Sequence, residues 1–346
     1  MNNHFRKMAT ALLLVGLPGY AACATSGTLI VLNKTDNTAT LIDLTNNTVR
    51  ATLPTGVGPH EVAVSPDGRI AVVTNYGGRE PGSSLTVIDV EKAVKIKAIE
   101  LGDYRRPHGI IWYGTGDEIL VTAEANKALL VVDIAKGIVR QAIPTDQEVS
   151  HMVALRPQQD RAFVANIRSG TATVIDLKQG EALRSIVTGD GAEGIDISPD
   201  GKEVWVSNRA ANTVSIIDAE KLEVVAELKS ADFPIRVKFT PDGKHVLVSH
   251  ARSGEVAVFA AKSRMEVRRI SMELTAIDEK ETRLFGDRFG KSPVPIGICI
   301  PPHGKSAYIA NSNADIVAVI DLSKWEIIER LPTGKEPDGL GWSLLR

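Results

Sequence analysis

Cysteine is nearly absent from this chain, which has 2 cysteines in 346 residues, Cys23 and Cys299. Cys23 falls in a predicted leader that is described below. If the leader is removed, Cys299 has no partner for an intramolecular disulfide. Packing and hydrogen bonds, rather than covalent cross-links, must therefore stabilise the fold.

Two other features are missing: an excess of one charge and, beyond the N-terminus, any apolar run near the roughly 20 residues that cross a bilayer. Lys and Arg number 40 and Asp and Glu number 42, which gives a formal net charge of -2. Nucleic-acid-binding domains carry a basic excess, so we expect no nucleic-acid partner. The chain also lacks the GxSxG, P-loop and HExxH motifs, which mark α/β-hydrolases, P-loop nucleotidases and zinc proteases.

The N-terminus has the pattern of a leader. Arg6 and Lys7 precede the apolar stretch MATALLLVGLPGYAACA, which ends in small residues at Ala24. A basic start, an apolar core and a small-residue exit are typical of a secretory signal peptide. We therefore predict that residues 1–24 are removed. Residues 25–346 then form a single mature domain, periplasmic or secreted, without a transmembrane segment.

Cys23 offers an alternative reading of this leader, because a cysteine at such a position can be acylated in a lipoprotein. A lipobox prefers leucine at the position that Tyr20 occupies, so acylation is the less favoured alternative. On either reading we expect the domain that follows to lie outside the cytoplasm.

One unit recurs seven times along the mature chain, with a base period of about 42 residues. Three positions define its register. The first ends a strand that reads VTN or similar: Asn33, Asn75, Ala123, Asn166, Asn208, His250 and Asn311. The second ends a strand that reads VID or similar: Asp43, Asp89, Asp133, Asp176, Asp218, Ala260 and Asp321. The third precedes the next apolar strand: His60, His108, His151, Glu193, Ile235, Ile296 and Asp338.

Each period holds four short β-rich runs separated by turn residues, such as SPDG at 65–68 and 198–201. Proline presets φ for a turn and glycine accepts a positive φ. Four strands in about 40 to 45 residues are typical of a propeller blade, so the sequence predicts an all-β, seven-bladed β-propeller with four antiparallel strands per blade. The chain starts with three strands, TLIVLN, TATLID and RATLP, and ends on GLGWSLL. We therefore expect the C-terminal strand to complete the first blade.

The units VVTN...LTVIDV and VSN...VSIID, together with SPDG, resemble those of the YVTN-repeat propellers, the YncE-like group, over essentially the whole mature chain. That superfamily is similar to the lactonase-type seven-bladed propellers and to the haem-carrying propeller domain of bacterial nitrite reductase. The resemblance implies the fold, whereas function has to be argued from the site, because propellers host binding, scaffolding and catalysis. The repeats depart from the pattern at Ala123 and Ala260, so the blades are not equivalent.

Strands alternate in direction within a blade, so the third repeat position and the loop from the second to the third strand share one face. This places His60, His108 and His151, from three consecutive blades, at the mouth of the central channel. Glu193 follows in the next blade, and Asp338 closes the ring beyond two isoleucines. Imidazole and carboxylate groups bind zinc, copper or iron and also act as acids and bases.

These four residues are the predicted catalytic residues, and they are equally the predicted ligands of a divalent transition metal: His60, His108, His151 and Glu193. Three alternatives stay open for the histidines. They hold a metal, they work in a metal-free polar pocket, or they are structural and bond to neighbouring loops.

Arginines gather on the loops of the same face. Guanidinium groups suit bidentate recognition of a carboxylate or phosphate, so we expect a small anionic ligand, although some arginines could pair with neighbouring carboxylates. The predicted ligand-binding residues are Tyr76, Arg79, Arg106, Arg168, Arg209, Arg236, His250 and Asp338. For His250, a plain turn role is the stronger alternative. The insertion at 272–293 lies on this face and is either a lid or a solvated charged loop.

Two functions of different classes agree with these observations. The first is a small-molecule site at the channel mouth, in a binding protein or in an enzyme. The enzyme would be a hydrolase or lyase of lactonase type, or an oxidoreductase. The second is an interaction scaffold that docks another protein of the cell envelope and has no catalytic activity. Side chains suited to catalysis are concentrated at the channel mouth rather than around the rim, which favours the first function.

Overall fold

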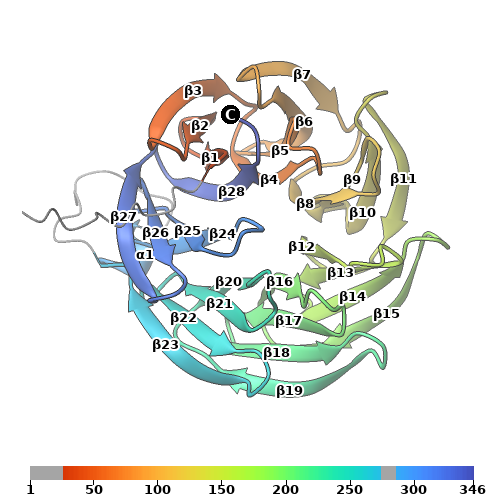
Figure 1. The fold of residues 1–346 in the computed structure, drawn as a ribbon. Coiled ribbons are helices and arrows are strands. Elements are labelled where there is room, and N and C mark those ends of the chain that lie inside the picture. Colours follow the sequence, from red (N-terminus) through yellow and green to blue (C-terminus); the bar gives the residue numbers. More distant parts are fainter. Residues whose placement is uncertain (1–25, 274–285) are drawn as a thin grey trace, which may run out of the picture.

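The computed structural model describes residues 26–273 and 286–346, so the predicted leader and residues 274–285 of the predicted lid lie outside the described residues. Within the described ranges the chain forms seven four-stranded antiparallel sheets around a common axis (Figure 1), which confirms the predicted seven-bladed β-propeller. Two short helices also occur in these ranges, η1 (Glu124–Asn126) and α1 (Gly286–Phe289). No described helix has the length and apolar character of a membrane span.

In blades two to seven the innermost strand comes first, and the blades follow one another along the chain, whereas the innermost strand of blade one is the last strand of the chain. Blade one contains β28 (Pro337–Ser343), β1 (Thr28–Asn33), β2 (Thr38–Asp43) and β3 (Thr48–Pro54). Blade two contains β4 (Pro59–Val64), β5 (Ile70–Gly77), β6 (Pro81–Asp89) and β7 (Val94–Glu100). Blade three contains β8 (Pro107–Tyr113), β9 (Glu118–Ala123), β10 (Ala128–Asp133) and β11 (Ile138–Pro144). Blade four contains β12 (Ser150–Leu155), β13 (Arg161–Asn166), β14 (Thr171–Asp176) and β15 (Glu181–Val187).

The remaining blades repeat the same order. Blade five contains β16 (Ala192–Ile197), β17 (Glu203–Asn208), β18 (Thr213–Asp218) and β19 (Glu223–Lys229). Blade six contains β20 (Pro234–Phe239), β21 (His245–His250), β22 (Glu255–Ala260) and β23 (Met265–Ser271). Blade seven contains β24 (Pro295–Cys299), β25 (Ser306–Asn311), β26 (Ile316–Asp321) and β27 (Glu326–Pro332).

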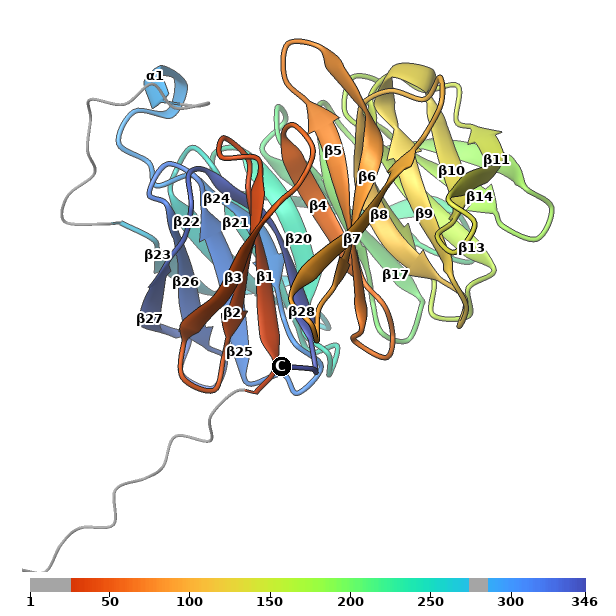
Figure 2. The ribbon, with the colours of Figure 1, turned by 90° about the horizontal axis from the view of Figure 1, so that it is seen from above.

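The ring closes in the first blade, whose sheet order is β28-β1-β2-β3. β28 pairs antiparallel with β1, with Thr28 opposite Ser343 and Val31 opposite Leu340. The C-terminal strand therefore completes the blade that the N-terminal strands begin, as predicted. Figure 2 shows the C-terminus on the face of the ring opposite to α1. Because the two ends of the chain pair with each other, the ring closes without an unpaired inner strand in the first blade.

The middle strands are buried because neighbouring blades cover each sheet on both faces. β1, β10 and β25 are buried at every position, whereas the outermost strand β15 is exposed along Glu181–Ser185. A strand covered on both faces reads as a nearly continuous apolar run, as in TLIVLN of β1. Trp205 of β17 is fully buried between blades, and its indole nitrogen donates to Glu203 Oε2 at 3.0 Å.

The repeated asparagines and aspartates have structural roles at opposite ends of the blades. Asn75 Nδ2 donates across the hairpin to Ser84 Oγ at 3.0 Å, and its Oδ1 accepts from the backbone nitrogen of Gly56 at 2.9 Å. Asp89 Oδ1 accepts from the backbone nitrogen of Lys92 at 2.9 Å and so caps the turn that follows. These side chains are therefore committed to the blade framework.

One residue in every blade adopts a left-handed conformation two positions before the third repeat position. Its φ lies between 54° and 78° in all seven: Gly58, Arg106, Val149, Gly191, Phe233, Val294 and Glu336. Its carbonyl accepts a hydrogen bond from the residue after the first repeat position, as from Tyr76 to Gly58 at 3.0 Å. This left-handed conformation costs a non-glycine residue about 1 kcal/mol of conformational free energy. This turn brings each third-position residue to the start of an inner strand, so the seven form a ring.

Candidate functional site

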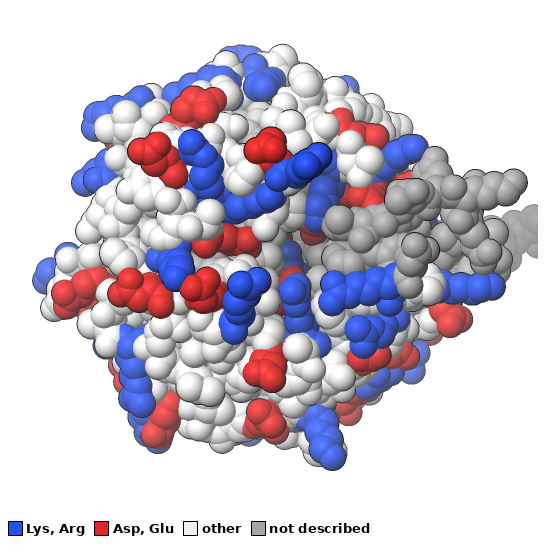
Figure 3. All heavy atoms as spheres, turned by 180° about the vertical axis from the view of Figure 1, so that it is seen from behind, with Lys and Arg blue, Asp and Glu red and all other residues white. Residues whose placement is uncertain are grey.

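Three histidines lie at the mouth of the central channel, at the starts of β4, β8 and β12. His60, His108 and His151 are buried, with exposed fractions of 7%, 2% and 7%. The ring centroids of His60 and His108 are 4.8 Å apart, and those of His108 and His151 are 3.6 Å apart. Figure 3 shows this face of the molecule, where basic side chains border the centre and acidic side chains lie between them. The three imidazoles that the repeat aligns thus form a row, in which His108 contacts both of the others.

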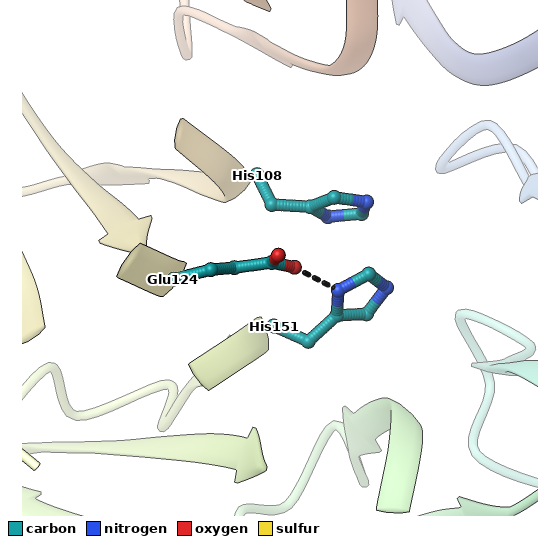
Figure 4. A group of neighbouring side chains, drawn as sticks. All are labelled: His108, Glu124 and His151. Carbon is teal, nitrogen blue, oxygen red and sulfur yellow. Dashed lines mark hydrogen bonds and ion pairs between the residues drawn. The ribbon is translucent and has the colours of Figure 1, made fainter. Parts of the chain in front are cut away.

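Glu124 connects His151 to Tyr76. It is a buried residue of η1, directly after β9. Glu124 Oε1 accepts a hydrogen bond from His151 Nδ1 (Figure 4), and Oε2 accepts one from the Tyr76 hydroxyl at 2.7 Å. Burial lowers the pKa of His151, but Glu124 and Glu193 raise it by more, so the pKa lies above its ordinary value. The two carboxylates therefore stabilise the imidazolium form of His151.

His108 and His60 have the opposite electrostatic character. His108 Nδ1 is buried without a hydrogen-bond partner among the described residues. Burial, followed by the nearby His151 and His60, lowers the pKa of His108 well below its ordinary value. His60 Nδ1 donates to the carbonyl of Gly58 at 2.9 Å. Burial, followed by the charge of Lys34, lowers the pKa of His60 to about 3. Both imidazoles are therefore neutral near pH 7.

Asp338 closes the ring of third-position residues beside His60. Its Oδ2 lies 3.3 Å from Lys34 Nζ and 4.0 Å from His60 Nε2. Burial raises the pKa of Asp338, but Lys34 and His60 lower it by more, so the carboxyl group is held below its ordinary pKa. Lys34 and Asp338 thus form an ion pair on one side of the histidines.

Glu193 forms a second set of ion pairs on the other side. Its Oε2 pairs with Arg209, and its Oε1 lies 3.5 Å from Arg236 Nη1. Oε1 is also 3.4 Å from His151 Nε2, without the alignment of a hydrogen bond. Burial raises the pKa of Glu193, but His151 and the two arginines lower it to about 2. Arg236 is itself buried and donates from Nη2 to Glu61 Oε1 at 2.7 Å.

A cavity of about 450 Å³ opens beside His151 on this face. Its lining combines the acid-base residues with basic and apolar ones: Tyr76, Glu124, His151, Arg168, Arg209, Arg288, Val149, Ile167, Gly191, Ala210 and Phe233. The volume lies within the range of about 300 to 1,000 Å³ that small-molecule sites occupy. Arg209 is paired with Glu193. Among the described residues, no carboxylate oxygen lies within 4.0 Å of the exposed Arg168 or Arg288, so two guanidinium groups face this cavity without an ion-pair partner.

The structure separates the predicted ligand-binding residues into two groups. Three of them line the cavity: Tyr76, Arg168 and Arg209. Arg106 lies next to the cavity, with its Cζ 4.7 Å from the centroid of the Tyr76 ring, and it donates to the carbonyl of Arg79 at 3.4 Å. His250 is fully buried elsewhere in the blade, where its Nε2 shares a hydrogen bond of 2.7 Å with Ser230 Oγ. Arg236 and Asp338 do not line the cavity, and both belong to the ion pairs described above.

Sequence reasoning did not assign Glu124, Phe233 or Arg288 to the site. Glu124 directly follows Ala123, where the repeat lacks its usual asparagine, and this break was the available signal. Phe233 stands at a left-handed position that is glycine in two other blades. Nothing in the one-dimensional pattern shows that Phe233 or Arg288 reaches the cavity.

Among the described residues, one group has spacing suited to metal binding: His108, Glu124 and His151, whose ligand atoms lie within 4.8 Å of one another. The predicted ligands His60 and Glu193 lie outside this group. Zinc bonds of about 2.0 to 2.1 Å place neighbouring ligand atoms about 3.3 Å apart, so the three groups would have to converge. The unpartnered Nδ1 of His108 and the carboxylate of Glu124 are donors that suit a divalent transition metal. His151 would join them if its Nδ1 exchanged its hydrogen bond to Glu124 for the metal.

Comparisons with known proteins agree with the fold. Residues 163–280, about a third of the chain, match the family described as "Lactonase, 7-bladed beta-propeller". This match supports a β-propeller family, and the finer YVTN-repeat assignment stays a prediction. No curated protein shows significant sequence similarity to the chain.

Two solved structures are similar to the chain as a whole. One is Kuenenia stuttgartiensis hydrazine synthase, with 20% sequence identity and a TM-score of 0.70 over 88% of this chain and 99% of that one. The other is a functionally unknown protein from Desulfotomaculum acetoxidans, with 14% identity and a TM-score of 0.75 over 93% and 100% of the two chains. Identities this low show the shared fold alone.

Proposed function

We propose that the cavity at the channel mouth binds a small organic anion and that His151 catalyses hydrolysis of a cyclic ester in that anion. The observation that carries the proposal is the hydrogen-bonded pair of Glu124 and His151 in a cavity edged by two arginines, Arg168 and Arg288, that have no carboxylate partner among the described residues. A carboxylate on one imidazole nitrogen orients the ring and leaves the other nitrogen to exchange a proton. The partial match to the lactonase family supports the same reaction class.

The chemistry follows from the proton positions. In the neutral imidazole His151 Nδ1 donates to Glu124, so Nε2 is the atom that accepts a proton from water. Because the two carboxylates raise the pKa of His151, this base form becomes more populated as the pH rises. The water oxygen attacks the ester carbonyl carbon, the ring carbon–oxygen bond breaks, and the imidazolium returns the proton to the leaving alkoxide. The Tyr76 hydroxyl holds the second oxygen of Glu124 at 2.7 Å and so fixes the carboxylate. Arg168 and Arg288 bind the anionic group of the substrate.

Location outside the cytoplasm is part of the proposal. It is supported by the leader-like pattern of residues 1–24. A hydrolase in that location acts on a substrate that reaches it from the environment or by export.

Replacing His151 with glutamine should lower kcat by about 100-fold, because a general base contributes that much or more. The assay follows proton release from the lactone 5-oxotetrahydrofuran-2-carboxylate and from the neutral γ-butyrolactone. Arg168→Ala should raise KM about tenfold for the carboxylate-bearing lactone only, since it removes one charge-assisted contact. His245→Gln, on the opposite face, is the matched control and should leave both constants unchanged. Equal activity of the His151→Gln variant, or hydrolysis of neither lactone by the unaltered protein, would contradict the proposal.

A metal centre on His108, Glu124 and His151 is the second candidate function. The unpartnered His108 Nδ1 favours it, because a buried imidazole nitrogen usually has a partner. A bound metal would supply a Lewis acid that polarises the substrate carbonyl. The expected outcome for this candidate is one zinc, copper or iron per chain by elemental mass spectrometry after dialysis against each metal, and its loss in His108→Ala. A metal content near zero in the unaltered protein would contradict the metal centre and retain the metal-free mechanism.

A further inference from the structure

Two bulky side chains stand at left-handed backbone positions beside the cavity. Val149 has a φ of 58° and Phe233 a φ of 64°, and both line the cavity. Glycine occupies the equivalent position in two other blades, as Gly58 and Gly191. The turn therefore needs no side chain at this position. A β-branched or aromatic residue at positive φ is strained, so its presence calls for a compensating role.

Packing accounts for one of the two side chains but not for the other. Phe233 is buried against Phe289 of α1, with ring centroids 4.9 Å apart. Val149 is only partly buried and is not among the buried apolar residues of the core. Backbone strain of this kind clusters at ligand-binding sites, where the side chain has a role that outweighs it. We therefore attribute Val149 to the cavity rather than to the core.

The cavity joins an apolar surface to a basic one. Ile167 is a third apolar side chain in its lining, beside Val149 and Phe233. The guanidinium carbons of Arg209 and Arg288 lie 5.3 and 5.6 Å from the centroid of the Phe233 ring. Arg209 is neutralised by Glu193. Within the part of the chain that the structure describes, Arg168 and Arg288 have no carboxylate partner, so they supply the positive charge of the lining. A ligand that fills this space meets carbon on one side and positive charge next to it.

We propose that the ligand of this cavity is an amphipathic anion, namely an aromatic or branched aliphatic carboxylate. Its apolar body packs on Val149, Ile167 and Phe233, where it releases water from apolar surface. Its carboxylate pairs with Arg168 and Arg288. A polyhydroxylated sugar acid binds more weakly, because its hydroxyl groups find no partners on the apolar wall. This inference rests on the proposed function, since it names the class of anion that the same site takes.

Calorimetric titration of the full mature chain with benzoate, acetate and gluconate tests this inference. Benzoate should bind at least about tenfold more tightly than acetate, because its ring adds buried apolar area while the carboxylate stays the same. Gluconate should bind no more tightly than acetate. Arg168→Ala should weaken benzoate and acetate alike, which identifies the cavity as the place of binding.

Val149→Gly separates a role in ligand binding from a role in stability. Benzoate affinity should fall about fivefold while acetate affinity stays the same, because the apolar contact is lost. The melting temperature should stay the same or rise, since glycine accepts the left-handed conformation without strain. Asparagine also tolerates the left-handed conformation, so Val149→Asn should show the same changes in benzoate affinity and melting temperature as Val149→Gly. Val294→Gly is the matched control: Val294 has a φ of 56° but is fully buried and does not line the cavity. It should lower the melting temperature and leave benzoate affinity unchanged.

Each of the other possible outcomes contradicts a specific part of the proposal: the apolar wall, the role of Val149 or the anion site. If benzoate and acetate bind equally and both depend on Arg168, the apolar wall does not select the ligand, while the anion site stands. If Val149→Gly lowers the melting temperature by several degrees and leaves the preference for benzoate intact, Val149 is a packing residue and the inference is wrong. If none of the three anions binds, the inference and the anion site of the proposed function both fail.

Discussion

Replacing Arg236 with methionine should lower the free energy of unfolding by about 3 to 5 kcal/mol near pH 7. The Arg236 side chain is 8% exposed and lies between the partly buried Glu61 and the buried Glu193, 2.7 Å from Glu61 Oε1 and 3.5 Å from Glu193 Oε1. Burial lowers the pKa of Arg236, but Glu61, Asp338 and Glu193 together raise it by more. Removal of the guanidinium leaves Glu61 without its charged partner in a poorly solvated position, and that uncompensated charge is the main cost.

The size of this loss should depend on pH in a defined direction. Burial raises the pKa of Glu61, and Arg236 counteracts part of that shift. Without Arg236 the Glu61 carboxyl group takes up a proton more readily, so the loss of stability should be smaller at pH 5 than at pH 8. Urea denaturation of both proteins at the two pH values measures it. The double variant Glu61→Gln, Arg236→Met is the control and should recover part of the loss. A loss below about 1 kcal/mol at pH 8 would show that the pair contributes no more than a surface salt bridge.

Acidification from pH 6.5 to pH 4.5 should destabilise the propeller through its buried neutral histidines. Burial, followed by Lys34, lowers the pKa of His60 to about 3, and burial, followed by Arg269, lowers that of His250 to about 4. In the unfolded chain a histidine titrates near pH 6.5, so below that pH the unfolded state binds more protons than the folded state. The free energy of unfolding therefore decreases as the pH is lowered, by about 1.4 kcal/mol per pH unit for each such histidine. The contribution of His250 levels off near pH 4 and that of His60 near pH 3.

Urea denaturation at half-unit steps between pH 7 and pH 4.5 measures this dependence. His60→Gln and His250→Gln should each reduce the slope of stability against pH by about 1.4 kcal/mol per unit, because glutamine does not titrate. The double variant should show the sum of the two reductions, since the residues lie in different parts of the ring. Slopes that are the same in all four proteins would mean that these histidines are already protonated in the folded state.

The sequence by itself determined the fold and the existence of a histidine ring. A unit of about 42 residues with four strands cannot bury its own faces, so seven units have to stack on one another and close. Residues at equivalent places in stacked units occupy equivalent places in space. His60, His108 and His151 therefore had to meet at one end of the channel, and the short first unit had to be completed by the C-terminal strand.

Only the tertiary structure decided which partner each of these side chains has. Glu124, which lies outside the three repeat positions, accepts a hydrogen bond from His151 Nδ1, while the predicted ligand Glu193 is held by Arg209. Of the predicted arginines, Arg236 pairs with Glu61 and Glu193 and does not line the cavity. Repeat spacing gives the position of a backbone segment, but hydrogen bonds and ion pairs depend on side-chain direction. That direction is set by local turns and by neighbours from other blades, which are distant in the sequence.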